Sequence, residues 1–288
     1  MPLAYIPSPA RAIWQFGPVP VRAAALFAVA GVVLGIVLAE RRYRSGGGRP
    51  WVITDVAVWA VPAGLIPALI GAFTAPLHGE AWQEIQSWDA ALGFPGAAGL
   101  GTLAAWAACR RRGRSRLRGP QADRVRLRAV LGAAAPALAF GHAVADVGGW
   151  AAQQSYGQPS SLWWAVEISP AHRLAGYENF ATFQPMFVYG ALGCVATGVI
   201  VLWASQRFEL AGDRAFALGA GLYAAGGFAV FWLGIGHLPL VLGLRAGELG
   251  DAVVLCGAAA YLVRTRRRRA TPVHAAQKSP LERDASTM

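Results

Sequence analysis

Apolar residues along the chain gather in seven stretches about twenty residues long, with polar connectors between them. A helix rises about 1.5 Å per residue, so about twenty apolar residues span the hydrocarbon core of a bilayer. The pattern therefore predicts an all-α integral membrane protein with seven transmembrane helices. The predicted spans are about 20–40, 53–75, 89–109, 128–148, 182–205, 215–236 and 247–263.

Arginine clusters predict how these helices are oriented. They follow the first, third and seventh apolar stretches, at residues 41–49, 110–118 and 264–269. Connectors with such clusters face the cytoplasm, so the N-terminus is expected outside and the C-terminus in the cytoplasm. Residues 1–269 are then expected to form one membrane domain, and the polar residues 270–288 a disordered cytoplasmic tail.

The connector at 149–182 differs from the others in its length and polarity. Glutamine, glutamate, histidine and arginine side chains interrupt it, so it is not expected to be an eighth span. Backbone groups outside helices need partners in water or protein. We therefore expect this segment to form an extracytoplasmic cap over the helices.

Composition agrees with a membrane location and excludes other classes. Hydrophobic residues make up 55% of the 288 residues and charged residues only 14%, too few to cover a soluble globule. The net charge of +11 alone could indicate a nucleic-acid partner, but none is expected, because the arginines flank apolar stretches. Cys109, Cys194 and Cys256 stand singly in apolar stretches and are expected to be buried small hydrophobes.

Residues 141–159, GHAVADVGGWAAQQSYGQP, leave the fourth apolar stretch and enter the cap. They resemble the signature of the prolipoprotein diacylglyceryl transferase family, which runs approximately G-R-x-G-N-x-x-N-x-E-x-Y-G-x-P. Four signature residues stand in register: Gly148, Tyr156, Gly157 and Pro159. The positions of the signature's arginine, first asparagine and glutamate hold Asp146, Gly149 and Gln154.

Other blocks are similar to the same family in the same order, among them IPSPARAIWQFGPVP at 6–20, DVAVWAVPAGLI at 55–66 and ATFQPMFVY at 181–189. The resemblance implies a multi-pass protein of the bacterial inner membrane that acts in lipoprotein biosynthesis. Family members transfer diacylglyceryl from phosphatidylglycerol to the lipobox cysteine of prolipoproteins, without a cofactor. The partners that the resemblance implies are phosphatidylglycerol or another phospholipid, and prolipoprotein signal segments.

The positions that carry the family's charges are altered in this chain. A thiol must attack the glycerol carbon beside the lipid phosphate, so the site needs cations for the phosphodiester and a base for the thiol. In the fifth span the family's glutamate position is Gly190, and in the sixth the charged positions are Gly227 and Phe231. The catalytic residues are therefore left unassigned, and substrate binding is expected at Gly96, Gly148, Tyr156, Gly157, Tyr189 and Arg245.

Two functions are compatible with this pattern. The first is a catalytically impaired paralogue that binds phospholipid or a lipoprotein precursor. The second is an active diacylglyceryl transferase in which other residues replace the lost groups, with Tyr156, Tyr189, Arg173 and Arg245 as the candidates.

His142 and Asp146 are four residues apart in the fourth span, so they share a helix face. Such a pair could transfer protons or begin a metal site with His237, but more commonly its members satisfy each other. No metal site is expected. The glycines of the third and sixth spans, which include Gly96 and Gly227, indicate either close helix packing or a cavity left by larger side chains.

Overall fold

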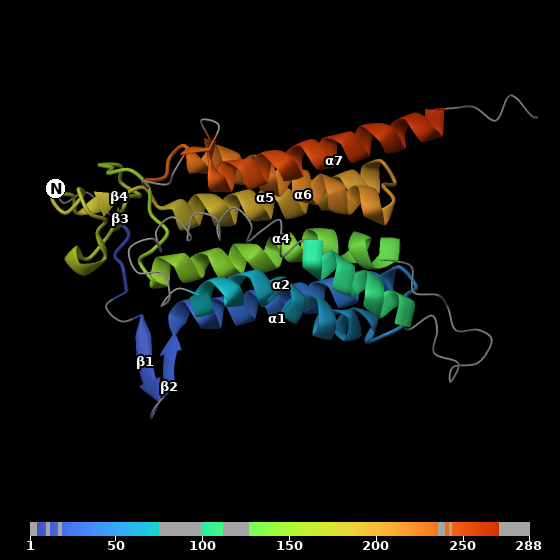
Figure 1. Ribbon diagram of the computed structural model, residues 1–288, viewed down its shortest axis with the longest axis horizontal. Coiled ribbons are helices and arrows are strands. Elements are labelled where there is room, and N and C mark those ends of the chain that lie inside the picture. Colours follow the sequence, from blue (N-terminus) through green and yellow to red (C-terminus); the bar gives the residue numbers. More distant parts are fainter. Residues whose placement is uncertain are drawn as a thin grey trace, which may run out of the picture.

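The computed structural model describes residues 5–9, 12–16, 19–74, 99–111, 127–235, 240–241 and 244–270. Long helices dominate this part of the chain and lie side by side (Figure 1). Each overlaps one predicted span, so the helical fold class is confirmed. Their bounds are Ala23–Ser45 (α1), Val52–Thr74 (α2), Leu127–Ala151 (α4), Met186–Arg207 (α5), Gly212–Phe231 (α6) and Ala246–Ala270 (α7), with a further helical segment at 99–111.

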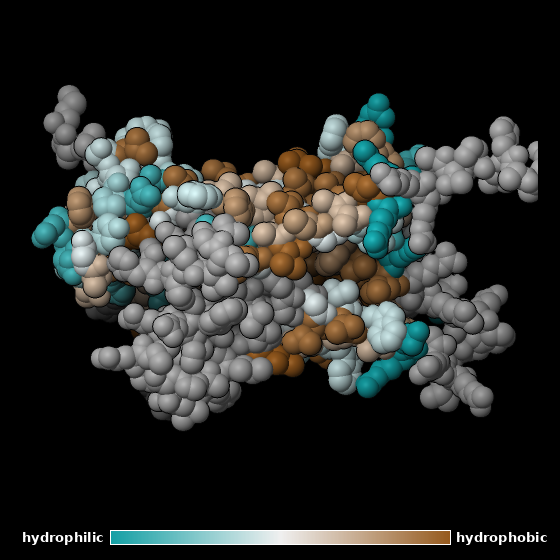
Figure 2. Space-filling model, turned by 45° about the horizontal axis from the view of Figure 1, so that its top comes forward, coloured by the Kyte–Doolittle hydropathy of each residue, from teal (hydrophilic) through white to brown (hydrophobic). Residues whose placement is uncertain are grey.

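Three of the described helices, α1, α4 and α5, are long and apolar enough to cross a membrane. α2 contributes a shorter apolar segment, Val52–Ile66. Hydrophobic side chains occupy the middle of the molecule, between two hydrophilic ends (Figure 2). Large apolar side chains such as Val29, Leu192 and Val253 are 61%, 63% and 69% exposed, as expected of surfaces that lipid tails cover.

α4 is the central helix of the bundle. It packs against α1 on one side and against α5 and α6 on the other, and α7 packs against α6 (Figure 1). Glycines allow the contact with α1, since a β-carbon on Gly31 would lie 2.3 Å from the backbone oxygen of Gly141. Helices in lipid associate through such close van der Waals contact. Glycine at these two positions therefore sets the approach of α1 to α4.

Glycines in α6 also support close packing, one of the two explanations that the sequence left open. A β-carbon on Gly221 would lie 3.2 Å from the β-carbon of Ala258 on α7, which is tighter than an ordinary contact. One on Gly219 would lie 3.4 Å from Val201 on α5, an ordinary van der Waals distance. Gly221 is therefore the position where a small residue lets the neighbouring helix approach.

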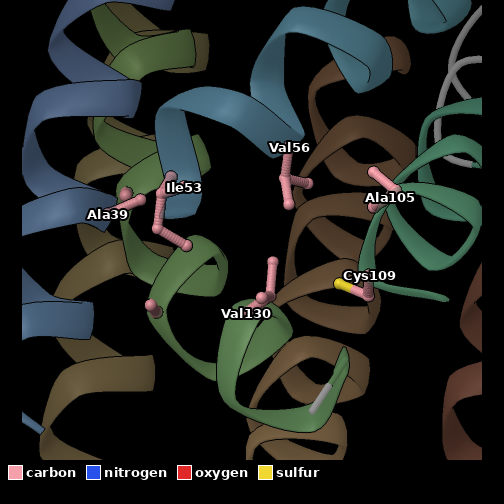
Figure 3. Packing of buried hydrophobic residues seen from close by; sticks show 9 residues of the cluster. Ala39, Ile53, Val56, Ala105, Cys109 and Val130 are labelled. Carbon is pink, nitrogen blue, oxygen red and sulfur yellow. The ribbon is translucent and has the colours of Figure 1, made fainter. Parts of the chain in front are cut away.

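A cluster of buried hydrophobic residues joins α1, α2, the 99–111 segment and α4 (Figure 3). Cys109 points into this cluster, and Cys194 on α5 is also buried, as expected for both. Cys256 on α7 is exposed, so the prediction of burial is wrong for this residue. Among the described helices α7 packs mainly against α6, and this leaves much of its remaining surface uncovered.

Polar contacts tie the helix ends opposite the cap. The Glu40 carboxylate at the end of α1 accepts a hydrogen bond of 3.0 Å from the backbone N–H of Ile53 and so caps α2. Asp213 at the start of α6 pairs with Arg128 of α4 at 3.3 Å and accepts a 2.6 Å hydrogen bond from the Tyr261 hydroxyl of α7. Three helices are thus joined at this end of the bundle.

Short antiparallel strand pairs lie outside the helices, and the sequence pattern did not predict them. Two to four residues are too few to show an alternating pattern. The pairs are β1 (Ile13–Phe16) with β2 (Val19–Arg22), β3 (Val166–Glu167) with β4 (Thr182–Phe183), and β5 (Leu240–Val241) with β6 (Leu244–Arg245). The segment predicted as a cap contains β3, the short 3-10 helix Pro170–His172 and the start of β4, at one end of the bundle (Figure 1).

Candidate functional site

The loop that follows α4 is held against the ends of two other helices. The backbone N–H of Gly157 donates to the oxygen of Gln184, just before α5, at 2.8 Å. The N–H of Gln158 donates to the oxygen of Leu233, just after α6, at 3.0 Å. A β-carbon at Gly157 would lie 2.4 Å from that Leu233 oxygen. Gly157 therefore fixes where the loop meets α5 and α6, because a larger residue would push the backbones apart.

Tyr156 anchors the cap through both ends of its side chain. Its hydroxyl donates a 2.6 Å hydrogen bond to the backbone oxygen of His172. Its ring packs against Phe183 with the ring centroids 4.9 Å apart, in a buried cluster with Val166 and Ile168. Burial raises the pKa of the Tyr156 hydroxyl above its usual range, so the group stays protonated and keeps donating.

Gln153 is a structural link that the sequence did not reveal. Its amide Nε2 donates to the backbone oxygen of Pro9 at 3.3 Å, and its Oε1 accepts from the N–H of Ser169 at 2.9 Å. The side chain is 8% exposed, and the backbone has a φ of 53°, in the left-handed region that few residues other than glycine adopt. The only sequence signal was a pair of glutamines at the end of an apolar stretch.

The N-terminal segment at 5–9 is part of the same cap. The N–H of Ile6 donates to the oxygen of Ala165 at 2.8 Å, and the N–H of Glu167 donates to the oxygen of Ile6 at 3.0 Å. The indole of Trp150, near the end of α4, donates to the oxygen of Pro7 at 3.2 Å. Residues far apart in the sequence thus close one end of the bundle.

Arg173 is used within the cap. Its Nε donates to the backbone oxygen of Ile168 at 3.0 Å, and its Nη1 donates to the backbone oxygen of Glu178 at 2.8 Å. Hydrogen bonds from backbone N–H groups, its own first and that of Gly176 next, lower the pKa of the Glu178 carboxyl. The guanidinium and the carboxylate therefore both order the turn that Arg173 and Glu178 enclose.

Tyr189 on α5 has a partner in the cap. Its hydroxyl oxygen accepts a 2.9 Å hydrogen bond from the indole of Trp164. The interaction joins the first turns of α5 to the loop before β3. Tyr189 is half-buried.

A second group of polar side chains lies between α4, α5 and α6. The Asp146 Oδ1 lies 3.6 Å from His142 Nε2, and its Oδ2 accepts a contact from the Cys194 thiol at 3.7 Å. Tyr223 of α6 reaches the same ring nitrogen, with its hydroxyl 2.9 Å from His142 Nε2. The pair predicted from the sequence is therefore formed, and α5 and α6 add a thiol and a phenol to it.

Two glycines make room for carboxylates in this region. A β-carbon on Gly190 of α5 would lie 3.0 Å from Asp146 Oδ2. A β-carbon on Gly227 of α6 would lie 2.6 Å from Oδ2 of Asp251, on α7. Both glycine faces are therefore covered by an aspartate from the neighbouring helix.

The structure brings the predicted site residues together in two groups. Asp146 lies beside Gly190 inside the bundle, and Tyr156 and Gly157 lie in the cap loop. Gly148 packs against Ala24 of α1, where a β-carbon would lie 3.1 Å from the Ala24 α-carbon. Residues not brought to either group are Gly149, whose β-carbon would meet Ser155 at 2.6 Å, and Gln154, which is exposed. Gly96, His237 and the side chains of Phe231 and Arg245 lie outside the described residues.

Comparison with known proteins decides the family. The sequence profile described as prolipoprotein diacylglyceryl transferase matches residues 11–263. This chain belongs to the prolipoprotein diacylglyceryl transferase family. It is 37% identical to phosphatidylglycerol–prolipoprotein diacylglyceryl transferase 2 of Streptomyces coelicolor over 274 residues, which are 93% of this chain and 83% of that protein. It is 36% identical to a transferase of Frankia alni over 273 residues, 93% of this chain and 69% of that protein.

Membership of the diacylglyceryl transferase family confirms the resemblance found at 141–159. It also agrees with a membrane protein, since several of the described helices are apolar and long. The names of the relatives give phosphatidylglycerol and prolipoproteins as the substrates of those proteins. Asp146 stands at the position of the signature's arginine. In this chain its side chain contacts His142 and Cys194.

Proposed function

We propose that this protein is a catalytically impaired member of the diacylglyceryl transferase family that binds phospholipid or a lipoprotein precursor without transferring the diacylglyceryl group. The observation that carries the proposal is the environment of Asp146. A carboxylate stands at the signature's arginine position, and its two oxygens face His142 and Cys194. An ionised Asp146 would repel the lipid phosphate that an arginine would attract.

The expected loss of transfer rate is large enough to support impaired catalysis. Removal of one preorganised group that stabilises transition-state charge typically lowers a rate by about 10²–10³. The charged positions of the signature and of the fifth and sixth spans hold Asp146, Gly190 and Gly227. Aspartates from neighbouring helices cover both glycines, so a side chain of the family's kind would not fit there without moving a carboxylate.

The protein is proposed to cross the bacterial inner membrane seven times, with the cap outside and the C-terminus in the cytoplasm. Arg41, Arg42 and Arg44 at the end of α1 support this orientation, because basic residues favour the cytoplasmic side. Arg207 ends α5, and Arg264 and Arg266 lie late in α7, so they add to the same end. The cap lies at the opposite end of the bundle (Figure 1).

An active transferase is the second candidate, and the identity of 37% to a protein named as a transferase favours it. Substitute residues would then have to do the chemistry. Tyr156 and Arg173 donate to backbone oxygens of the cap, and Tyr189 accepts from Trp164. These engagements would have to break before the side chains could reach a substrate, which is why we prefer the impaired paralogue.

Lipid binding tests the first proposal. The purified protein is reconstituted in nanodiscs of phosphatidylcholine with a small share of phosphatidylglycerol, and the lipids retained after re-extraction are counted by mass spectrometry. We expect phosphatidylglycerol to be enriched over phosphatidylcholine among the retained lipids. When a lipobox peptide is added in place of phosphatidylglycerol, we expect the peptide to be retained with the protein. No enrichment of either would contradict the proposed binding function.

Asp146→Asn makes this test specific to the site. At about 4 Å, one repulsive charge is worth about 1 kcal/mol in water and about 4 kcal/mol at an effective dielectric constant of about 20, so in chelator-treated protein the variant should hold phosphatidylglycerol about tenfold more tightly. Glu209→Gln is the matched control, because Glu209 is exposed in the turn between α5 and α6, at the other end of the bundle. Equal effects of both variants would show that net charge, and not the site, controls binding.

A further inference from the structure

His142, Asp146 and Cys194 form a cluster that the family's chemistry does not require. One ligand atom from each side chain lies within 4.8 Å of the other two. Two of the residues come from one face of α4, and Cys194 comes from α5. The sequence predicted no metal site, because it offered only the pair on α4 and the separate His237; the thiol of Cys194 is the third ligand atom that packing adds.

The distances in the cluster suit a small divalent ion. Bonds of about 2.0–2.3 Å from zinc to nitrogen, oxygen and sulfur place neighbouring ligand atoms about 3.3–3.7 Å apart in a tetrahedron. The carboxylate lies between its neighbours, with Oδ1 3.6 Å from His142 Nε2 and Oδ2 3.7 Å from Cys194 Sγ. Each spacing is in this range but involves a different carboxylate oxygen, so the Asp146 carboxylate would rotate to bring one oxygen to the ion.

Gly190 contributes to this arrangement by having no side chain. A β-carbon there would lie 3.0 Å from Asp146 Oδ2, the oxygen that faces Cys194. A larger residue would press on this oxygen and shift the carboxylate by a few tenths of an ångström. Gly190 stands where the family resemblance implies a glutamate. Because glycine has no side chain, the Asp146 carboxylate can lie against α5.

Charge balance also favours an ion at this place. The carboxylate and a thiolate carry two negative charges between them, which a doubly charged cation would neutralise, whereas either charge alone is costly among apolar helices. Thiolate, imidazole and carboxylate together are ligands that zinc accepts. The described helices do not enclose the imidazole, since the His142 side chain is 46% exposed.

We propose that His142, Asp146 and Cys194 bind a zinc ion. Binding forms bonds from the metal to His142 Nε2, to an Asp146 carboxylate oxygen and to Cys194 Sγ, and the thiol proton passes to water; no electrons are transferred. The Tyr223 hydroxyl, which lies 2.9 Å from His142 Nε2, would give up this contact to the metal, and the fourth position stays open for water. Three protein ligands and one exchangeable position are the usual arrangement of a reactive zinc site.

Zinc content of the purified full chain tests the proposal. The protein in detergent is stripped with a chelator, dialysed against zinc chloride and then against buffer, and its metal is counted by mass spectrometry. We expect about one zinc ion per chain in the wild type. Cys194→Ser and Asp146→Asn should each weaken binding at least about tenfold. Cys256→Ser is the control, since this exposed cysteine lies on α7, outside the cluster.

Cobalt provides a second measurement that does not depend on activity or lipid binding. Cobalt bound in place of zinc should give thiolate-to-metal absorption in the near ultraviolet in the wild type and in Cys256→Ser, and none in Cys194→Ser. Less than about a tenth of an ion per chain in the wild type, or unchanged zinc binding and absorption in Cys194→Ser, would overturn the proposal. Because Asp146→Asn keeps the size of the side chain, it tests the site even if Cys194→Ser folds poorly.

Discussion

The carboxylate of Asp251 on α7 lies against the α-carbon of Gly227 on α6, so closely that a β-carbon there would be 2.6 Å from Asp251 Oδ2. Gly227 stands at a position of the sixth span where the family resemblance implies a charged residue. In this chain the carboxylate of the neighbouring helix lies against that position. A larger side chain could not be placed there unless Asp251 moved.

This contact predicts that Gly227→Ala destabilises the protein. Overpacking costs about 1–3 kcal/mol, and a small loss is expected here because the clash is with the end of the Asp251 side chain, so the midpoint of thermal unfolding in detergent should fall slightly. Gly226→Ala is the matched control, because its β-carbon would meet none of the described residues within 4 Å, and alanine is the better helix former. An equal fall in both variants would mean that the contact with Asp251 is unimportant.

A double variant separates the contact from other effects of the methyl group. Asp251→Ala removes the carboxylate that the new β-carbon meets. If the two residues interact as described, Gly227→Ala should cost less in the Asp251→Ala background, with a coupling energy of about 0.5–3 kcal/mol. Additive effects of the two substitutions on unfolding would contradict the interaction.

Gln153→Ala should loosen the attachment of the N-terminal segment to the cap. The substitution leaves the Pro9 oxygen and the Ser169 N–H without the partners they have now, which costs about 1–3 kcal/mol. Hydrogen exchange of the amides of Ile6 and Glu167 should become faster, since their hydrogen bonds hold this segment. Gln154→Ala is the control, because the Gln154 side chain is exposed. This variant should leave the exchange of both amides unchanged.

Tyr156→Phe should cost about 0.5–1.5 kcal/mol of unfolding free energy near neutral pH, because only the hydrogen bond to His172 is lost. The ring contact with Phe183 stays, so Tyr156→Ala should cost more, about 3–5 kcal/mol. Chemical or thermal unfolding in detergent measures both. A loss in Tyr156→Phe as large as that in Tyr156→Ala would contradict the separate role of the ring.

Tyr156→Phe should also change the pH dependence of the free energy of unfolding. Burial raises the pKa of Tyr156 in the folded state, so the unfolded chain ionises first as the pH rises through about 10. The stability that the protonated hydroxyl contributes is therefore present below that pH and is lost above it. The difference between wild type and Tyr156→Phe should shrink as the pH rises above about 10, and a constant difference would contradict the assignment.

The helices could be predicted from the sequence because each apolar stretch is long enough to specify one. Contacts between helices could not be predicted in the same way. Cys194 meets Asp146 because Gly190 leaves space, and a glycine gives no signal of what fills that space. The role of Gln153 depends on a left-handed backbone conformation and on a segment more than a hundred residues away, which periodicity does not reveal.

The orientation is testable with reporter fusions. The arginines at one end of the bundle predict a cytoplasmic C-terminus, so a fluorescent protein that folds only in the cytoplasm should fluoresce when fused after Met288. Alkaline phosphatase, which is active only outside the cytoplasm, should be inactive there and active when fused after Ser161 in the cap. The reverse pattern would contradict the proposed orientation.

The central claim is that the altered charges have removed diacylglyceryl transfer. Its most direct test is the transfer of labelled diacylglyceryl from phosphatidylglycerol to a lipobox peptide, measured with the purified protein beside the Streptomyces coelicolor relative. We predict a rate below about one hundredth of that of the relative, the loss expected from a single missing charge-stabilising group. A rate within about a hundredfold of the relative would contradict impairment, and would direct attention to Tyr189 and Arg245 as substitute groups.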